Sequence, residues 1–330
     1  FLGYFSNKVE LSEFQFKHQL KKIDYRGPDY SRVVKCDNVM LGHNRLSILG
    51  LNSESNQPMV NKDRGIYLVF NGEIYNYLEL KKELIDYSFK TNSDTEIIIA
   101  AYCKWGVKFV QKINGMFSIA IYDKRKGIIL LVRDHIGKKP LYYSHSNGCF
   151  SFGSEVKALT GLPGVGTKIS KLATNQYFST GYIGGKHSIY EDILQLSAGH
   201  YAIFNIQDYS SLNIKRYWHL PVSDNITNVD ENELVDELDE LLLNSIKLRM
   251  RSDVPIGFFL SGGLDSSLMV AMASKISNTP LNTFTIEFPN TPNDESEYAG
   301  NISSYFSTHH TKHKINEEIL QLENKQTDSK

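Results

Sequence analysis

The sequence is poor in cysteine, in long apolar runs and in net charge, and each shortage argues against a class of protein. Its three cysteines, Cys36, Cys103 and Cys149, are widely spaced and form no Cys-x-x-Cys pair, which is typical of a reducing cytosol rather than of a disulfide framework. No apolar stretch approaches the roughly 18–20 residues that span a bilayer, and the opening residues lack the features of a signal peptide. The formal net charge is −1, which argues against nucleic acid or an anionic membrane as a partner. We therefore expect a cytoplasmic protein with neither partner.

What is present is enough chain for two domains. The 330 residues include 41% hydrophobic and 22% charged residues, as in ordinary globular proteins. Alternating strands and helices fill the first two thirds, and a polar segment at 224–230 resembles a linker. We expect one α+β domain over residues 1–208 and a second domain over 209–330.

Local patterns predict the elements of both domains. Strands are expected at 66–71, 117–122, 127–133 and 141–144, with a hairpin turn at 123–127. Helices are expected to begin at Ser12 and Ser93, where a capping residue precedes an apolar stripe, and over 77–84. Further on, a strand is expected at 281–288, and Asp230 is expected to cap a helix whose buried stripe is Leu234, Leu238, Leu241 and Ile246.

The segment 254–267 passes from an apolar strand to a helix through Ser261-Gly262-Gly263. Glycines there let backbone N–H groups approach a phosphate, and the helix N-terminus stabilises its charge. A carboxylate at Asp265 would repel the phosphate unless a cation bridges them, so we predict that Asp265 contacts Mg²⁺. No Gly-Lys-[Ser/Thr] is present, which excludes a Walker A loop. The alternative is an ordinary strand–helix turn with capping residues.

A series of short motifs precedes this loop. They are Arg26-Gly27-Pro28-Asp29, Gly42-His43-Asn44-Arg45-Leu46-Ser47-Ile48, Gln57-Pro58-Met59, Asn71-Gly72-Glu73-Ile74-Tyr75-Asn76, Ser93-Asp94-Thr95-Glu96, Asn114-Gly115-Met116-Phe117, Arg133-Asp134 through Gly137-Lys138-Lys139-Pro140-Leu141-Tyr142-Tyr143, and Phe152-Gly153-Ser154-Glu155-Val156-Lys157-Ala158-Leu159. Together with the loop at 261–267, and in this order, they resemble the glutamine-hydrolysing asparagine synthetases.

This resemblance implies a fold and a reaction. The first domain would be a class II, N-terminal-nucleophile (Ntn) glutaminase with an αββα sandwich, which releases ammonia from L-glutamine. The second would be an α/β, doubly wound parallel-sheet ATP-pyrophosphatase domain. With ATP and Mg²⁺ it would convert L-aspartate to β-aspartyl-AMP, which the ammonia then amidates. A homodimer is a possible assembly that the sequence does not determine.

The resemblance also assigns residues to the glutamine pocket. Asn71 and Gly72 would form the oxyanion hole, and removal of one such donor typically costs about 2.7–4 kcal/mol in the barrier. Arg45 would hold the α-carboxylate, while Glu73 and Asp94 would hold the α-ammonium. Taken alone, Asn71-Gly72 also fits a hairpin turn and Asp94 fits helix capping. The full glutamine-binding set is Arg45, Leu46, Ser47, Ile48, Asn71, Gly72, Glu73 and Asp94.

The family's nucleophile is an N-terminal cysteine whose own α-amino group acts as the base. On the family register that cysteine falls two residues before Phe1. We therefore expect the 330 residues alone not to hydrolyse glutamine. The family also extends beyond the last residue, so we expect a whole glutaminase domain followed by only the front part of a synthetase domain.

In the second domain the resemblance assigns ATP to the strand ends and the glycine turn: Leu260, Ser261, Gly262, Gly263, Leu264, Asp265, Ser266 and Ile286. The acceptor is open, because some relatives amidate other carboxylates, such as sugar acids. A second alternative is a non-catalytic domain similar to the β-lactam synthetases. The histidine-rich segment 308–313 is expected to be a solvated segment after a helix rather than a metal site.

Overall fold

A computed structural model describes residues 1–146, 148–222, 230–289, 291 and 294–315. The chain forms two compact units, Phe1–Val222 and Ser223–Lys330, here called the first and the second unit. In the ranges that are described, no helix is both long enough and apolar enough to cross a membrane.

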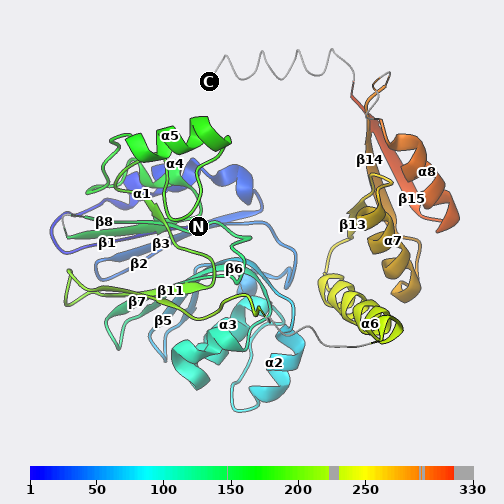
Figure 1. The fold of residues 1–330 in the computed structure, drawn as a ribbon. Coiled ribbons are helices and arrows are strands. Elements are labelled where there is room, and N and C mark those ends of the chain that lie inside the picture. Colours follow the sequence, from blue (N-terminus) through cyan, green and yellow to red (C-terminus); the bar gives the residue numbers. More distant parts are fainter. Residues whose placement is uncertain (147, 223–229, 290, 292–293, 316–330) are drawn as a thin grey trace. The chain divides into compact units, whose positions relative to one another are not determined.

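The first unit contains two antiparallel sheets stacked face to face (Figure 1). The first sheet has the order β10 (Leu194–Gln195), β8 (Tyr142–Ser146), β9 (Cys149–Gly153), β1 (Leu2–Ser6), β3 (Val39–Arg45) and β2 (Tyr30–Cys36). The second has the order β12 (Leu212–Arg216), β11 (His200–Asn205), β7 (Ile128–Arg133), β6 (Gly115–Asp123), β5 (Ile66–Ile74) and β4 (Met59–Asn61).

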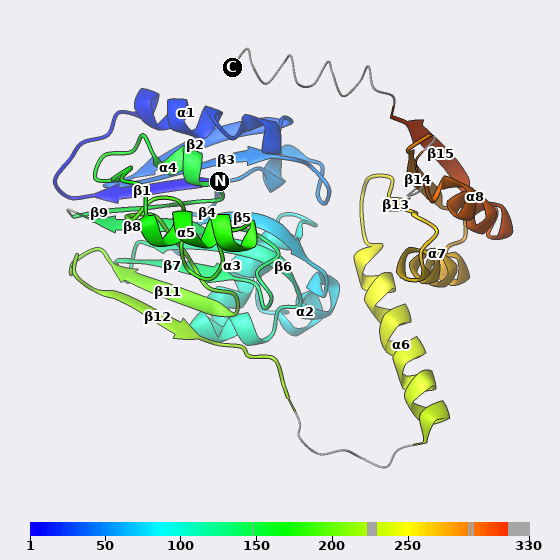
Figure 2. The same cartoon turned by 45° about the horizontal axis from the view of Figure 1, so that its top comes forward.

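Helices cover the outer faces of the two sheets. Helix α1 (Glu13–Lys21) lies on the first sheet, whereas α2 (Tyr77–Glu83) and α3 (Asp94–Trp105) lie on the second (Figure 2). The remaining helical elements of this unit are the 3₁₀ turns η1 (Asp24–Arg26), η2 (Ser53–Ser55) and η3 (Gly106–Gln111) and the helices α4 (Val156–Leu159) and α5 (Lys171–Thr180). This is the helix–sheet–sheet–helix order of an αββα sandwich.

Apolar side chains fill each boundary between layers. One cluster packs α3 against the outer face of the second sheet, a second lies between the sheets, and a third packs α1 against the first sheet. Strands β5 and β6 have apolar runs at 66–70 and 119–122, where both faces of these strands are largely buried. The expected hairpin at 123–127 is confirmed, since Asp123 pairs with Ile128 across β6 and β7.

Local capping explains where the helices begin. Ser12 forms the expected capping box with Gln15 before α1, and Ser93 accepts a hydrogen bond from the amide of Thr95 before α3. The boundary expected at residue 208 falls between the paired strands β11 and β12, and the first unit continues to Val222.

The second unit is a β-α-β-α-β arrangement. Strands β13 (Gly257–Phe259), β14 (Asn282–Glu287) and β15 (His309–Lys314) pair in parallel in that order. Helices α7 (Leu264–Ile276) and α8 (Ser296–Tyr305) form the crossovers, after α6 (Glu231–Arg249). The predicted parallel sheet is confirmed over these strands. Most of the histidine-rich segment lies in β15, which follows α8, and its side chains are mostly exposed, as expected of a solvated segment after a helix. Its backbone forms a strand because it pairs with β14.

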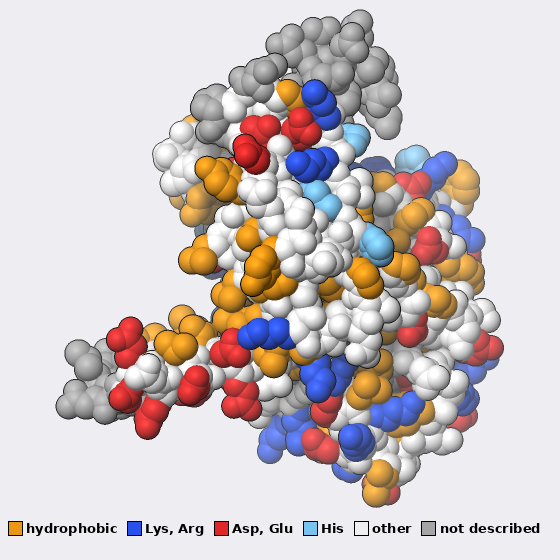
Figure 3. Space-filling model, turned by 90° about the vertical axis from the view of Figure 1, so that its right-hand side faces the viewer, with side chains coloured by type: hydrophobic (Ala, Val, Ile, Leu, Met, Phe, Trp, Pro, Cys, Tyr) orange, Lys and Arg blue, Asp and Glu red, His pale blue; other side chains and the backbone are white. Residues whose placement is uncertain are grey.

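The predicted buried stripe on α6 is wrong over most of its length. Ile246 is 2% exposed, but Leu234, Leu238 and Leu241 are 49%, 55% and 59% exposed. The last turns of α6 pack against α7 and the small core of this unit, whereas the apolar side chains of the earlier turns are exposed. Figure 3 shows hydrophobic and acidic side chains exposed together on this helix.

Candidate active site

The largest concentration of predicted site residues lies in one pocket of the first unit, with a volume of about 420 Å³. Residues at the ends of β3 and β5 line it, although these strands belong to different sheets. The lining residues are Tyr25, Arg26, His43, Asn44, Arg45, Leu46, Ile48, Leu49, Gln57, Phe70, Asn71, Gly72, Glu73, Asp94, Thr95, Met116 and Lys139. The structure thus brings together every predicted glutamine-pocket residue except Ser47.

Asn71 and Gly72 lie near the end of β5, paired with β6. The φ of Gly72 is +146°, and a Cβ atom built there would lie 1.9 Å from the carbonyl oxygen of Met116. Only glycine fits this backbone. The side-chain Nδ2 of Asn71 is buried and has no hydrogen-bond partner, which leaves an unsatisfied amide donor on a residue that lines the pocket.

Two carboxylates lie beside this pair. Asp94 occupies the first position of α3, where its Oδ2 accepts a hydrogen bond from the amide of Ile74 at 2.9 Å. Burial raises the pKa of Asp94 to about 7, with a further increase from the charge of Glu73, while the hydrogen bonds it accepts oppose the shift. Burial also raises the pKa of Glu73, against the effect of Lys139. Ser93 caps the helix, so Asp94 is not its N-cap.

Arg45 is bound to the protein itself. Its Nη1 donates to the carbonyl oxygen of Asn52 at 3.2 Å and to Oδ1 of Asn56 at 2.7 Å. Its Nη2 donates to the carbonyl oxygens of Leu49 and Gly50 at 3.0 and 2.5 Å. Arg45 as a whole is only 6% exposed. Both terminal nitrogens therefore hold the 49–56 loop, and this arrangement shapes the wall of the pocket.

The three residues after Arg45 form a turn at the mouth of the pocket. Leu46 and Ile48 line the pocket, and Leu46 is 56% exposed. The backbone amide of Ser47 donates to Oδ2 of Asp29 at 2.7 Å, which ties the turn to the segment after η1.

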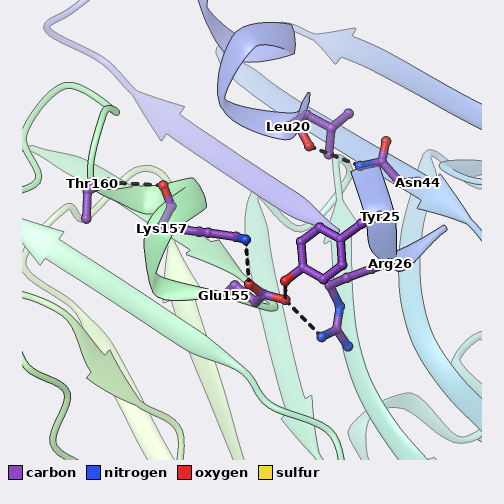
Figure 4. Close-up of polar contacts among 7 residues, drawn as sticks. All are labelled: Leu20, Tyr25, Arg26, Asn44, Glu155, Lys157 and Thr160. Atoms are coloured by element: carbon purple, nitrogen blue, oxygen red, sulfur yellow. Dashed lines mark hydrogen bonds and ion pairs between the residues drawn. The ribbon is translucent and has the colours of Figure 1, made fainter. Parts of the chain in front are cut away.

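Sequence reasoning assigned no role to several charged or polar lining residues, among them Arg26, His43 and Lys139. All three lie in motifs that carry the family resemblance, and their place in these motifs could have indicated that they line the pocket. Figure 4 shows how Arg26 is held: its Nη1 donates to Oε1 of Glu155 at 2.9 Å. Tyr25 donates to the same oxygen. Glu155 therefore ties η1 to the segment that follows β9.

The start of β1 lies next to this pocket. The backbone nitrogen of Phe1 is buried and donates to Oγ of Ser154 at 3.0 Å. Leu2, the first residue of β1, pairs with Gly42 of β3, the residue before His43. Because His43 lines the pocket, the first strand begins beside it.

In the second unit, the glycine turn connects β13 to the N-terminus of α7. The φ of Gly262 is +87°, and a Cβ there would lie 2.7 Å from the backbone nitrogen of Ala299. Oγ of Ser261 accepts a hydrogen bond from the amide of Gly263 at 3.2 Å and lies 3.1 Å from Oγ of Ser266. Oγ of Ser267 is buried without a partner.

A pocket of about 350 Å³ adjoins this turn and includes Leu260, Ser261, Ser266 and Ile286. Within the described residues, no group of three or more His, Cys, Asp or Glu side chains is placed to hold a metal ion. A single carboxylate at Asp265, in the first turn of α7, is the donor set expected where Mg²⁺ is held mainly by the phosphates of a nucleotide. Helix-terminal amides, hydroxyls and one carboxylate are groups that fit a magnesium–phosphate ligand, and of these the hydroxyls of Ser261 and Ser266 line the pocket whereas Asp265 does not.

Comparisons with known proteins found relatives that are named as asparagine synthetases. Over 311 residues, this chain is 39% identical to the protein of Methanocaldococcus jannaschii named as a putative glutamine-hydrolyzing asparagine synthetase 2. The aligned region covers 88% of this chain and 59% of the relative. Asparagine synthetase 2 of Bacillus subtilis is 36% identical over 91% of this chain and 42% of its own length. Asparagine synthetase B of Escherichia coli is 35% identical over 83% of this chain and 44% of its own length.

The chain thus spans about half the length of the curated relatives it matches. A family model for the asparagine synthase domain matches residues 237–324. A second model, for the glutamine amidotransferase domain, matches residues 1–218, which is more than half of the chain. The chain therefore belongs to the glutamine amidotransferase family, with an asparagine synthase region after the amidotransferase domain.

Proposed function

We propose that the first unit binds L-glutamine and hydrolyses its carboxamide, as the glutaminase part of a glutamine-dependent asparagine synthetase. The observation that carries the proposal is the convergence of Asn71, Gly72, Glu73 and Asp94 in one pocket. Two acids beside a free amide donor complement a substrate that has both an ammonium group and a carbonyl at which negative charge develops.

Each group has a proposed role. Nδ2 of Asn71 and the amide of Gly72 would donate to the oxyanion, which is where preorganised donors contribute most to the rate. Glu73 and ionised Asp94 would hold the α-ammonium. The α-carboxylate would lie toward Arg45 and the turn 46–48. Because Arg45 already binds the 49–56 loop, its main contribution would be to hold this wall in place.

We propose that the nucleophile is a cysteine two positions before Phe1. The support is geometric, since Leu2 at the start of β1 pairs with Gly42, the residue before His43 of the pocket. A residue at that end would bring a thiol and a free α-amino group to the carboxamide, and an α-amino group titrates close enough to neutrality to act as a general base.

We propose that the second unit contributes to an ATP site with Mg²⁺, in which L-aspartate is adenylated before ammonia attacks it. Ser261, Gly262, Gly263, Leu264 and Ser266 would bind the pyrophosphate portion. Asp265 would contact Mg²⁺, and Leu260 and Ile286 would lie against the nucleotide. Bound ATP would supply the adenylyl group, with pyrophosphate as the leaving group. Aspartate is the acceptor that the names of the relatives favour.

Calorimetry and ammonia release test the glutaminase assignment. L-Glutamine titrated into the purified chain should give heat of binding without hydrolysis. The chain preceded by Cys-Gly, with the initiator methionine removed, should release ammonia, and the matched Ser-Gly form should not. Asn71→Ala in the Cys-Gly form should lower kcat by roughly 10²–10³. If glutamine binds to neither form, the proposal is wrong.

AMP formation tests the acceptor. A protein that joins this chain to the further length of its relatives should form AMP only when ATP, aspartate and a nitrogen source are all present. If AMP forms with a sugar acid and not with aspartate, the acceptor is another carboxylate. The glutaminase assignment would be unaffected.

A further inference from the structure

Two buried polar atoms of the pocket have no hydrogen-bond partner. They are Nδ2 of Asn71 and Nδ1 of His43. Both residues line the pocket, and His43 is only 6% exposed. Because buried polar atoms in proteins are almost always paired, these two atoms on residues that line one pocket are candidates for contact with a ligand.

The hydrogen bonding of His43 defines what its free nitrogen can do. Nε2 of His43 lies 2.9 Å from the carbonyl oxygen of Phe70. A carbonyl oxygen only accepts, so Nε2 carries the proton, and in the neutral ring Nδ1 is a bare acceptor. Burial lowers the pKa of His43 to about 3, which keeps the ring neutral at physiological pH. Asn71, the next residue after Phe70, supplies the donor.

A primary carboxamide is the complement of this donor–acceptor pair. Its oxygen accepts a hydrogen bond and its NH₂ group donates one, whereas both oxygens of a carboxylate only accept. We propose that Nδ1 of His43 accepts an N–H of the substrate carboxamide while Asn71 donates to its oxygen, so that His43 selects glutamine over glutamate. The inference rests on the proposed function, because it takes glutamine as the ligand of this pocket.

The rejection of glutamate follows from the same geometry. A carboxylate oxygen in the place of the NH₂ group would face the lone pair of Nδ1 with no proton between them. A buried site built to bond an N–H group disfavours an analogue that lacks it, because the protein atom is then left unpaired. His43 is therefore a positioning and specificity residue, and it need not transfer a proton.

Two substitutions separate the two nitrogens of His43. His43→Gln keeps an N–H group near the position of Nε2, for the carbonyl of Phe70, but has no acceptor at the position of Nδ1. His43→Asn keeps an acceptor near the position of Nδ1 but loses the contact with Phe70. The matched control is His145→Gln, because Nε2 of His145 also contacts a backbone carbonyl, that of Tyr209 at 2.6 Å, outside the pocket.

The experiment measures Kd for L-glutamine and L-glutamate by calorimetry, with a thermal melt for each variant. The unsubstituted chain should bind glutamine more tightly than glutamate. His43→Gln should lower this preference roughly three- to tenfold, the effect of one neutral hydrogen bond. His43→Asn should melt at a lower temperature but retain most of the preference, and His145→Gln should leave the preference unchanged.

Three outcomes would overturn the inference: an unsubstituted chain without preference, a folded His43→Gln variant that retains the full preference, or a His43→Asn variant that loses it. If His43→Gln does not fold, the preference of His43→Asn for glutamine over glutamate decides whether the inference holds. Failure of the unsubstituted chain to bind glutamine would instead refute the proposed function. Glutamine binding with an unaltered preference in His43→Gln would refute only the role of His43.

Discussion

Asp94 is the first residue of α3, and its carboxylate accepts a hydrogen bond from the backbone of β5. Burial raises the pKa of this carboxyl group by more than its hydrogen bonds lower it. A carboxyl group that titrates near neutrality can match its charge to the ligand. With the pKa raised to about 7, an arriving ammonium group would favour the ionised form. Glutamine binding should therefore release protons below neutral pH and weaken as the pH falls.

The same shift predicts a pH dependence of stability. The folded chain binds the proton of Asp94 more tightly than the unfolded chain, whose pKa is near 3.8, so stability falls as the pH rises from about 4 to about 7 and then levels off. Asp94→Asn removes this titration. The unfolding free energy of this variant minus that of the parent should therefore be roughly 2–4 kcal/mol larger at about pH 8 than at about pH 4.5.

Urea unfolding of parent and variant across this pH range provides the measurement. Ser12→Ala is a suitable control, since it removes the cap of α1 at a cost of about 1 kcal/mol without removing a titrating group. Its effect should be the same at each pH. A constant difference between Asp94→Asn and the parent would show that Asp94 does not titrate as described.

At the scale of elements, the pocket depends on the close pairing of β5 with β6. Gly72→Ala should destabilise the first unit by about 2–4 kcal/mol, because the new methyl group meets the carbonyl oxygen of Met116 and φ is +146°. Gly181→Ala is the matched control: its φ is +79°, but nothing lies within 4 Å of the added Cβ. It should cost only about 1–2 kcal/mol. Equal losses in thermal melts would exclude steric contact as the cause.

Elements that depend on neighbouring residues were predictable from the sequence, and those that depend on distant partners were not. The cap at Ser93 and the strands through 66–71 and 117–122 follow from local patterns, and the structure confirms them. The stripe at Leu238 was wrong, because periodicity indicates an apolar face but not what covers it. Likewise, the roles available to His43 depend on Phe70, which only the stacking of the two sheets brings near.

At the scale of the molecule, the described core clusters do not cross the boundary between the units. The clusters that pack both sheets belong to the first unit, and the cluster around Ile246 belongs to the second. The pocket with Asn71 is lined by residues of the first unit. The glutamine site should therefore fold and bind without the second unit.

A chain that ends at Val222 should keep the melting temperature of the first unit and bind glutamine within about twofold of the full chain, because its apolar contacts are intact. A chain that ends at Asp208 loses β12, which pairs with β11, and also the hydrogen bond at 2.8 Å from the hydroxyl of Tyr217 to the carbonyl oxygen of Arg133. It should melt about 5–10 °C lower. Differential scanning calorimetry distinguishes the two boundaries. If both truncated chains melt together, β12 contributes nothing to the first unit, and if the longer one fails to fold, the first unit depends on the second.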